Sequence, residues 1–240
     1  MLERRFTFVL VHGGWVGGWV WREVASHLRA AGHEVFTPTL TGLGERVHLA
    51  TPETDLDTHI QDIVGVLEYE DVREVILVGH SYGGMVITGV AEKVPERLAH
   101  LVYLDALVPE DGQSMADIFG PEIGRRFEGA AQAYGDGWRV PHDPPDAPRM
   151  TPHPLKTGVQ ALAVKNPAAK ALPRTFIYCT VGKEEMTTGF AITRAAERAK
   201  AEGSWRYLEL PTRHVPMETA PLELAAALQG IAAPAPSEAS

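Results

Sequence analysis

Cysteine is almost absent from this sequence, which has only one, Cys179, among 240 residues. A disulfide within the chain is therefore impossible. Cys179 ends the apolar run Phe-Ile-Tyr-Cys at 176–179, which favours a small buried residue in a strand over a reactive thiol. The sequence also lacks paired cysteines and histidine–cysteine clusters with metal-ligand spacing, so we expect no metal site.

Positive charge is scarce as well. The 22 lysines and arginines are outnumbered by 31 aspartates and glutamates, which gives a formal net charge of −9. This balance argues against nucleic acid or an anionic membrane as the partner. Long apolar runs are missing too, and the first run, 6–12, is too short for a signal peptide or a membrane span. We therefore expect a cytoplasmic protein, and the sequence does not distinguish a monomer from a homodimer.

The sequence does contain a regular alternation of short β-branched runs with longer amphipathic segments. This alternation is typical of an α/β protein with a doubly wound, mostly parallel sheet. We predict strands at 6–12, 33–37, 73–79, 98–105, 174–180 and 205–210. We predict helices at 19–31, 56–70, 82–94, 190–201 and 221–231, with Asp55 as the N-cap of the second.

The alternation breaks at 108–172, a segment that is rich in proline and glycine and shows no strand pattern. A segment of this length between regular elements is too long for a simple loop and is usually functional. We interpret it as a partly helical cap inserted between two parts of a core, 1–107 and 173–231. The last residues, 232–240, are rich in Ala, Pro and Ser and are expected to form a flexible tail.

Residues 79–83 read Gly-His-Ser-Tyr-Gly and directly follow the apolar run at 75–78. This is the G-x-S-x-G nucleophile elbow, in which a serine occupies a strained turn between a strand and a helix. The serine hydroxyl then stands above the sheet. Ser81 is therefore the candidate nucleophile.

A serine hydroxyl is a poor nucleophile at neutral pH and needs a general base. Of the ten histidines, His214 follows the last predicted strand, so its loop can reach the sheet edge that carries the serine. His80 should point away from the nucleophile and pack or hydrogen-bond beneath the elbow. We interpret His59 as a solvated residue of a surface helix, and His142 and His153 as cap residues that could contact substrate.

An acyl-transfer site also needs N–H donors for the developing oxyanion. The amide of Tyr82, directly after the nucleophile, is one candidate. The loop after the first strand reads His-Gly-Gly-Trp at 12–15, an HGG-type signature that makes Gly14 the second candidate. A phosphate-binding loop is the alternative interpretation, but neither G-x-G-x-x-G nor a lysine-bearing P-loop is present.

Over its whole length the sequence resembles the α/β-hydrolase superfamily. It is most similar to small cap-bearing esterases related to plant methylesterases and hydroxynitrile lyases. The resemblance rests on Leu-Val-His-Gly-Gly-Trp at 10–15, Gly-Gly-Trp-Val-Trp at 17–21, Ala-Gly-His-Glu-Val at 31–35, and the segments 76–85 and 109–112. It implies a cofactor-free serine hydrolase that cleaves small, largely apolar carboxylic esters through an acyl-enzyme. Arg213, before the candidate base, replaces the glycine that relatives often carry.

The resemblance leaves the acid of the triad open. Relatives usually carry it just after the strand at 174–180, but this chain has Gly and Lys at 182–183. Glu184 or Glu185 could reach the base from that loop. Asp105, at the end of the strand that follows the nucleophile's helix, is the other candidate. We favour Asp105, because some α/β-hydrolases place their acid after that strand.

Apolar residues near the predicted site are candidates for the substrate pocket: Trp15, Met115, Phe119, Met186, Val215 and Met217. The same machinery could cleave an amide, a lactone or a carbon–carbon bond. A hydroxynitrile-lyase-like enzyme is one alternative, but those lyases carry Thr at the position of Gly13 and Lys at that of Val215. A non-catalytic small-molecule binding protein is another, because the usual acid is missing.

Overall fold

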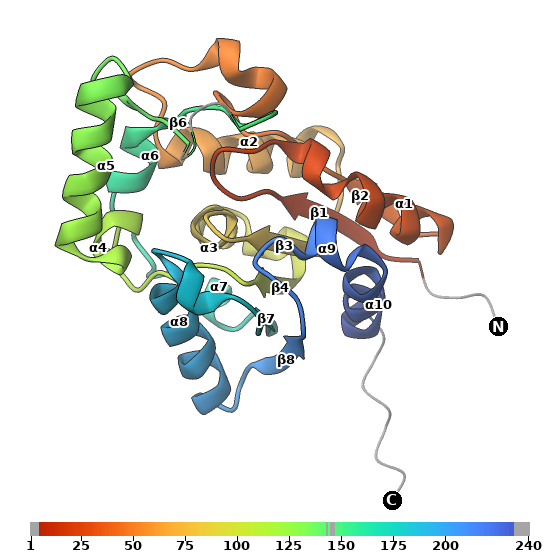
Figure 1. Cartoon of the computed structure of the whole chain (residues 1–240). Helices are drawn as coiled ribbons and strands as arrows, with labels where there is room; N and C mark the ends of the chain where they lie inside the picture. The colour runs from red at the N-terminus through yellow and green to blue at the C-terminus, as the bar shows by residue number, and fades with distance from the viewer. Residues whose placement is uncertain (1–4, 143, 145–146, 233–240) are drawn as a thin grey trace, which may run out of the picture.

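The centre of the molecule is a six-stranded sheet with the order β2-β1-β3-β4-β7-β8, in which every neighbouring pair is parallel. A computed structural model describes residues 5–142, 144 and 147–232 (Figure 1). The strands are β1 (Thr7–Val11), β2 (Glu34–Phe36), β3 (Val75–His80), β4 (Leu98–Leu104), β7 (Arg174–Cys179) and β8 (Arg206–Leu210). The predicted fold class, an α/β protein with a doubly wound and mostly parallel sheet, is confirmed.

Helices cover both faces of the sheet, and the alternation of side chains along each strand explains why. In β1, Phe8 and Leu10 face one core and Val9 and Val11 face the other, and all four are fully buried. The first core is closed by α1 (Arg22–Ala30) and α10 (Pro221–Ala232). The second is closed by α2 (Leu56–Tyr69), α3 (Gly83–Lys93) and α8 (Gly189–Ala201).

Local signals in the sequence locate these elements to within a few residues. The predicted cap of α2 is confirmed. The Asp55 side chain accepts the backbone N–H of Thr58, and the Thr58 hydroxyl oxygen accepts the backbone N–H of Asp55. This reciprocal arrangement satisfies two groups that a bare helix end would leave unpaired. Short elements without a clear pattern were not predicted: η2 (Gly44–Leu49), η3 (Pro95–Arg97), η4 (Lys183–Glu185) and α9 (Pro216–Thr219).

The proline-rich segment 108–172 folds into short helices, three of which lie together at one side of the sheet (Figure 1). These are α4 (Met115–Phe119), α5 (Pro121–Tyr134) and α6 (Leu155–Val159), whereas α7 (Pro167–Lys170) packs against α3. The expectation that this segment has no strand is wrong, because β5 (Arg139–Val140) pairs antiparallel with β6 (His153–Pro154). Two-residue strands are too short to produce an alternating pattern.

In the part of the chain that the structure describes, no helix combines the length and the apolar surface that spanning a membrane requires. Within the same residues, the His, Cys, Asp and Glu side chains form no group of three or more that could hold a metal ion. Of the predicted flexible tail, Ala232 ends α10 and 233–240 lie outside the described residues.

A close approach between α3 and the segment after β4 fixes the helix behind the serine. A Cβ atom at Gly84 would lie 2.0 Å from the backbone oxygen of Leu107, whereas a Cβ at Gly65 in α2 would meet nothing within 4 Å. Both glycines lie inside helices, so the two sites differ mainly in the space around them.

We predict that Gly84→Ala lowers the free energy of unfolding by about 2–3 kcal/mol, since backbone has to move to admit the methyl group. The matched control Gly65→Ala should raise it by about 0.5–1 kcal/mol, because alanine is the better helix former. Urea denaturation followed by circular dichroism measures both. A Gly84→Ala protein as stable as the wild type would contradict the close contact.

Candidate active site

Ser81 occupies a sharp turn between β3 and α3 with a φ of 54°, a conformation that non-glycine residues rarely adopt. Flanking glycines make the turn possible. A Cβ at Gly79 would lie 2.6 Å from the backbone oxygen of Gly83, and a Cβ at Gly83 would lie 2.9 Å from that of His12. The Ser81 carbonyl accepts the N–H of Gly84 at 3.1 Å, which joins the turn to α3.

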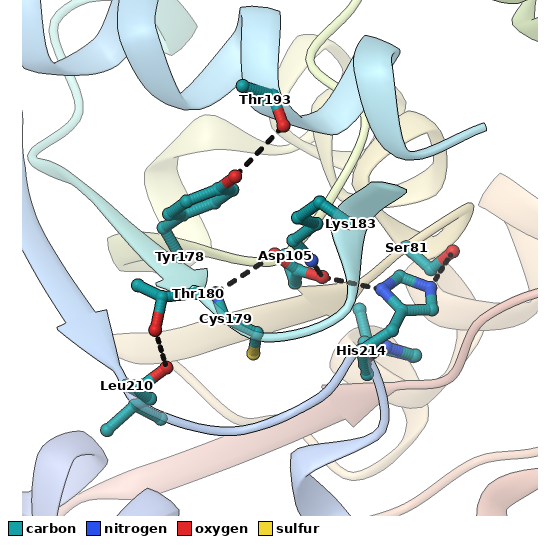
Figure 2. Close-up of polar contacts among 10 residues, drawn as sticks. Ser81, Asp105, Tyr178, Cys179, Thr180, Lys183, Thr193, Leu210 and His214 are labelled. Atoms are coloured by element: carbon teal, nitrogen blue, oxygen red, sulfur yellow. Dashed lines mark hydrogen bonds and ion pairs between the residues drawn. The ribbon is translucent and has the colours of Figure 1, made fainter. Parts of the chain in front are cut away.

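A continuous series of hydrogen bonds runs from Ser81 through His214 to Asp105 (Figure 2). The serine Oγ lies 3.0 Å from Nε2 of His214, and Nδ1 of His214 lies 2.6 Å from Oδ2 of Asp105. Asp105 directly follows β4, and His214 lies in the loop after β8. The three side chains meet because the carboxyl ends of parallel strands share one edge of the sheet.

Asp105 is fully buried, and both of its oxygens have partners. Oδ1 accepts the backbone N–H of Cys179 at 3.0 Å, while Oδ2 accepts from Nζ of Lys183 as well as from His214. Burial alone would raise the pKa of Asp105. The hydrogen bond and charge of His214, followed by those of Lys183, outweigh that effect and lower this pKa, which keeps the carboxylate ionised.

The two alternative acids lie elsewhere. Glu184 and Glu185 are both exposed on η4, and Glu185 forms an ion pair with Arg213 at 2.6 Å. Lys183, which directly precedes Glu184, points inward, and its side chain is only 10% exposed. The carboxylate that the structure brings to His214 is therefore that of Asp105.

His80, which the sequence predicts to pack or hydrogen-bond beneath the elbow, contacts His214. Its Nε2–H donates to the backbone oxygen of His214 at 2.7 Å, and the two ring centroids lie 4.7 Å apart. Burial, followed by the charge of His214, lowers the pKa of His80 to about 3. His80 is therefore neutral at physiological pH, so it fixes the backbone of the His214 loop without adding charge to it.

Two backbone N–H groups are available beside the serine. Within the described residues, neither the amide of Gly14 nor that of Tyr82 donates a hydrogen bond. A Cβ at Gly14 would lie 4.0 Å from the Cβ of Tyr82, so the two loops are neighbours. They are brought together because β1 and β3 pair directly. This arrangement suits an anion that forms next to Ser81.

The expectation that His59 is solvated is wrong, because its side chain is fully buried. Its Nε2–H donates to the backbone oxygen of Thr41 at 2.8 Å, so Nδ1 accepts from the hydroxyl of Tyr82 at 2.9 Å. Burial lowers the pKa of His59 to about 4. The missed signal is its spacing: His59 continues the buried stripe of Leu56, Ile60 and Ile63 on α2.

His153 in β6 reaches the site from the segment 108–172 and is also buried. Its Nδ1 accepts the backbone N–H of Trp15 at 3.4 Å, and its Nε2–H donates to the hydroxyl of Thr157 at 2.8 Å. Nδ1 lies 3.5 Å from where a Cβ of Gly14 would be. Burial, followed by the charges of His59 and His12, holds the pKa of His153 well below its usual value.

Trp15 and His153 help to line a small cavity, with a volume of about 10 Å³, roughly enough for one water molecule. Its lining is mainly apolar and includes Trp15, Met115, Phe127, Val140, Leu155 and Val159. Two of the predicted pocket residues, Trp15 and Met115, thus line this cavity.

The other four predicted pocket residues lie outside that lining. Phe119 packs edge-on against Phe127, with ring centroids 6.0 Å apart. Met186 and Val215 are partly buried against the two cores. Met217 is only 1% exposed and packs in the core with residues of α10. Among the cap histidines, His142 is half-buried, and its ring centroid lies 6.4 Å from that of Trp15.

Comparison with curated proteins finds relatives that are esterases by name. The chain is 52% identical over 131 residues to a carbendazim hydrolyzing esterase of Nocardioides sp. (strain SG-4G), covering 53% of this chain and 54% of that protein. It is 34% identical over 135 residues to putative methylesterase 14, chloroplastic, of Arabidopsis thaliana, covering 54% of this chain and 39% of that protein. The chain thus spans about half or less of the length of these relatives.

Comparison with solved structures supports the same fold over nearly the whole chain. An extracellular alpha/beta-hydrolase from a Paenibacillus species matches with a TM-score of 0.75 and 26% identity, over 93% of this chain and 97% of that one. A pyrethroid hydrolase from Sphingobium faniae JZ-2 matches in fold with a TM-score of 0.74 and 22% identity, over 95% and 98%. The model of the alpha/beta hydrolase family matches residues 8–227. The chain therefore belongs to the alpha/beta hydrolase family.

Proposed function

We propose that this protein hydrolyses carboxylic esters, with Ser81 as the nucleophile, His214 as the general base and Asp105 as the acid of the triad. The observation that carries the proposal is the hydrogen-bonded series from Ser81 Oγ through His214 to Asp105. The proposed enzyme needs no cofactor. Residues 108–172 act as its cap over the core segments 1–107 and 173–231, and a cytoplasmic location stays a prediction from the sequence.

In the proposed reaction, Ser81 Oγ attacks the ester carbonyl carbon while Nε2 of His214 takes the hydroxyl proton. The amides of Gly14 and Tyr82 donate to the oxyanion of the tetrahedral intermediate. Asp105 stabilises the imidazolium that forms, because its carboxylate accepts the Nδ1–H. His214 then gives the proton to the leaving alcohol, and the acyl group stays on Ser81.

Deacylation repeats these steps with water. His214 takes a proton from the water, the hydroxide adds to the acyl carbon, and the proton returns to Ser81 Oγ as the carboxylic acid leaves. The proposed substrate is a small, largely apolar ester, and the apolar side chains of Trp15 and Met115, which line the small cavity, are the candidates for contact with it. The relatives named as esterases support ester hydrolysis as the reaction.

The lyase alternative remains relevant because an alpha-hydroxynitrile lyase of Arabidopsis thaliana is 33% identical over 110 residues. The surroundings of Gly13 argue against it. A Cβ there would lie 3.0 Å from Nδ1 of His80 and 3.1 Å from the Cβ of Ser81, so a threonine would crowd the nucleophile. Val215 likewise replaces the lysine expected in such a lyase. The other alternative is a binding protein without activity, and activity measurements exclude or support it.

We expect the wild-type protein to hydrolyse p-nitrophenyl esters and to prefer those with short acyl chains. We expect Ser81→Ala to lose at least about 10³-fold in turnover. The variant removes one oxygen and should keep the wild-type circular dichroism spectrum. Turnover of the variant near the wild-type rate would refute the assignment of Ser81. A wild-type protein that binds but does not hydrolyse the panel would favour the binding protein.

His214→Ala should lose activity by a similar factor, because the serine and its base act as one unit. For the same reason, the double variant Ser81→Ala/His214→Ala should be no slower than either single variant. Initial rates on the best ester of the panel measure this. Losses that multiply in the double variant would mean that the two residues act independently.

Asp105→Asn should lower turnover strongly, by roughly 10⁴-fold as in a serine protease, because the amide favours the wrong tautomer of the base. Glu184→Gln and Glu185→Gln provide matched controls and should stay within a few-fold of the wild type. If one of the glutamate variants is impaired and Asp105→Asn is not, the acid has been assigned to the wrong residue. If all three remain active, the enzyme works as a Ser–His pair.

A further inference from the structure

A buried cation shares the carboxylate of Asp105 with His214. Nζ of Lys183 donates to Oδ2 of Asp105, the same oxygen that accepts from Nδ1 of His214 (Figure 2). The Lys183 side chain is 10% exposed and that of Asp105 is not exposed at all. The pair is therefore largely shielded from solvent. Charges in such a buried place act on one another more strongly than they do at a surface.

The loop after β7 is built to hold Lys183 in this position. Gly182 adopts a left-handed conformation, with a φ of 77°, directly before it. A Cβ at Gly189 would lie 2.2 Å from the backbone oxygen of Lys183, so α8 packs against that peptide. The Lys183 ammonium also lies 5.2 Å from the ring centroid of Tyr178, a cation–π distance. Backbone geometry and packing thus direct this side chain toward Asp105.

We propose that Lys183 is a positioning residue that acts on His214 through the Asp105 oxygen they share, and that its charge extends activity to lower pH than the Ser–His–Asp series alone would allow. This inference rests on the proposed function, since it concerns the base of that reaction. Lys183 contacts neither Ser81 nor the proposed oxyanion donors, and it acts through Asp105.

The charges of the cluster explain the effect. Lys183 and Asp105 form an ion pair whose opposite charges offset each other. When His214 takes a proton, the cluster gains a net positive charge in a poorly solvated place, and the lysine ammonium opposes that change. A like charge near an ionisable group disfavours its charged form, by about one pH unit or more at close range. Removing the lysine should therefore make activity fall at a higher pH on acidification.

The other groups that face His214 do not supply this charge. His80 from β3 stays neutral, because burial, followed by the charge of His214, lowers its pKa to about 3. Burial raises the pKa of the Cys179 thiol in β7, so that group is neutral too. Arg213 is adjacent in the chain, but its side chain is 60% exposed and is paired with Glu185. Lys183 is thus the buried cation of the cluster.

The test is the pH dependence of kcat/KM on the best ester, measured for the wild type and for Lys183→Gln, Lys183→Met and Lys183→Arg. Removing the charge should move the midpoint of the acidic limb upward by about 0.5–1 pH unit. The plateau at high pH should change only a few-fold. Lys183→Gln retains a hydrogen-bond donor without charge and should shift like Lys183→Met, whereas Lys183→Arg should stay near the wild-type midpoint.

Arg213→Gln is the matched control, because it removes a positive charge next to His214 that is solvated and paired. Its acidic midpoint should move by less than about 0.2 units. Circular dichroism over the same pH range separates loss of activity from loss of fold. A lower rate at every pH with an unchanged midpoint in the folded Gln and Met variants would make Lys183 merely structural and overturn the inference.

Failure of this inference is distinguishable from failure of the proposed function. If Asp105→Asn is severely impaired but both neutral Lys183 variants keep the wild-type midpoint, the triad stands and the role of the lysine does not. If Ser81→Ala or Asp105→Asn retains wild-type turnover, the proposed function itself fails.

Discussion

One buried carboxylate organises the carboxyl edge of the sheet. Asp105 has no exposed surface, and an ionised group in such a place is strongly destabilising unless it is paired and hydrogen-bonded. Its oxygens receive donors from three segments: the N–H of Cys179 in β7, the ammonium of Lys183 in η4 and the ring of His214 after β8. Its own N–H donates to the backbone oxygen of Ile177 at 2.7 Å. Satisfying this one charge therefore holds these three segments in fixed positions near the serine.

The same arrangement explains how a carboxylate can reach His214 from a strand other than the one that relatives usually use. β4 and β7 are parallel neighbours, so residues just beyond their ends lie side by side at one edge. A carboxylate on either strand can then meet a histidine that arrives from beyond β8. In this chain Asp105 after β4 carries the negative charge, and Lys183 in the loop after β7 carries the positive one. The loops after β4 and β7 thus carry opposite charges. Relatives usually have one carboxylate here, in the loop after β7.

Much of the fold and the central part of the site follow from patterns within short stretches of the sequence. The apolar run of β3 and the turn at Ser81 are local, and Asp105 and His214 follow from the rule that parallel strands share an edge. The environments of His59 and His153 do not follow in this way. His59 is a polar residue on an apolar stripe, and the burial of His153 depends on a contact with Trp15 that is 138 residues away in the chain. The inward direction of Lys183 depends likewise on packing against Asp105, 78 residues earlier.

Trp15 joins the loop after β1 to the segment 108–172 through several hydrogen bonds. Its backbone N–H donates to His153, its indole N–H donates to the Val140 oxygen at 3.0 Å, and its carbonyl accepts the N–H of Thr151 at 2.9 Å. Trp15 also has a φ of 61°, a strained value that persists only where its surroundings enforce it. The segment that carries β5 and β6 therefore helps to set the backbone next to Gly14. The cavity that Trp15 and His153 help to line has a volume of only about 10 Å³, so its lining side chains would have to move to admit any group larger than a water molecule. Because His153 accepts from the Trp15 N–H, such a movement would act directly on the backbone next to Gly14.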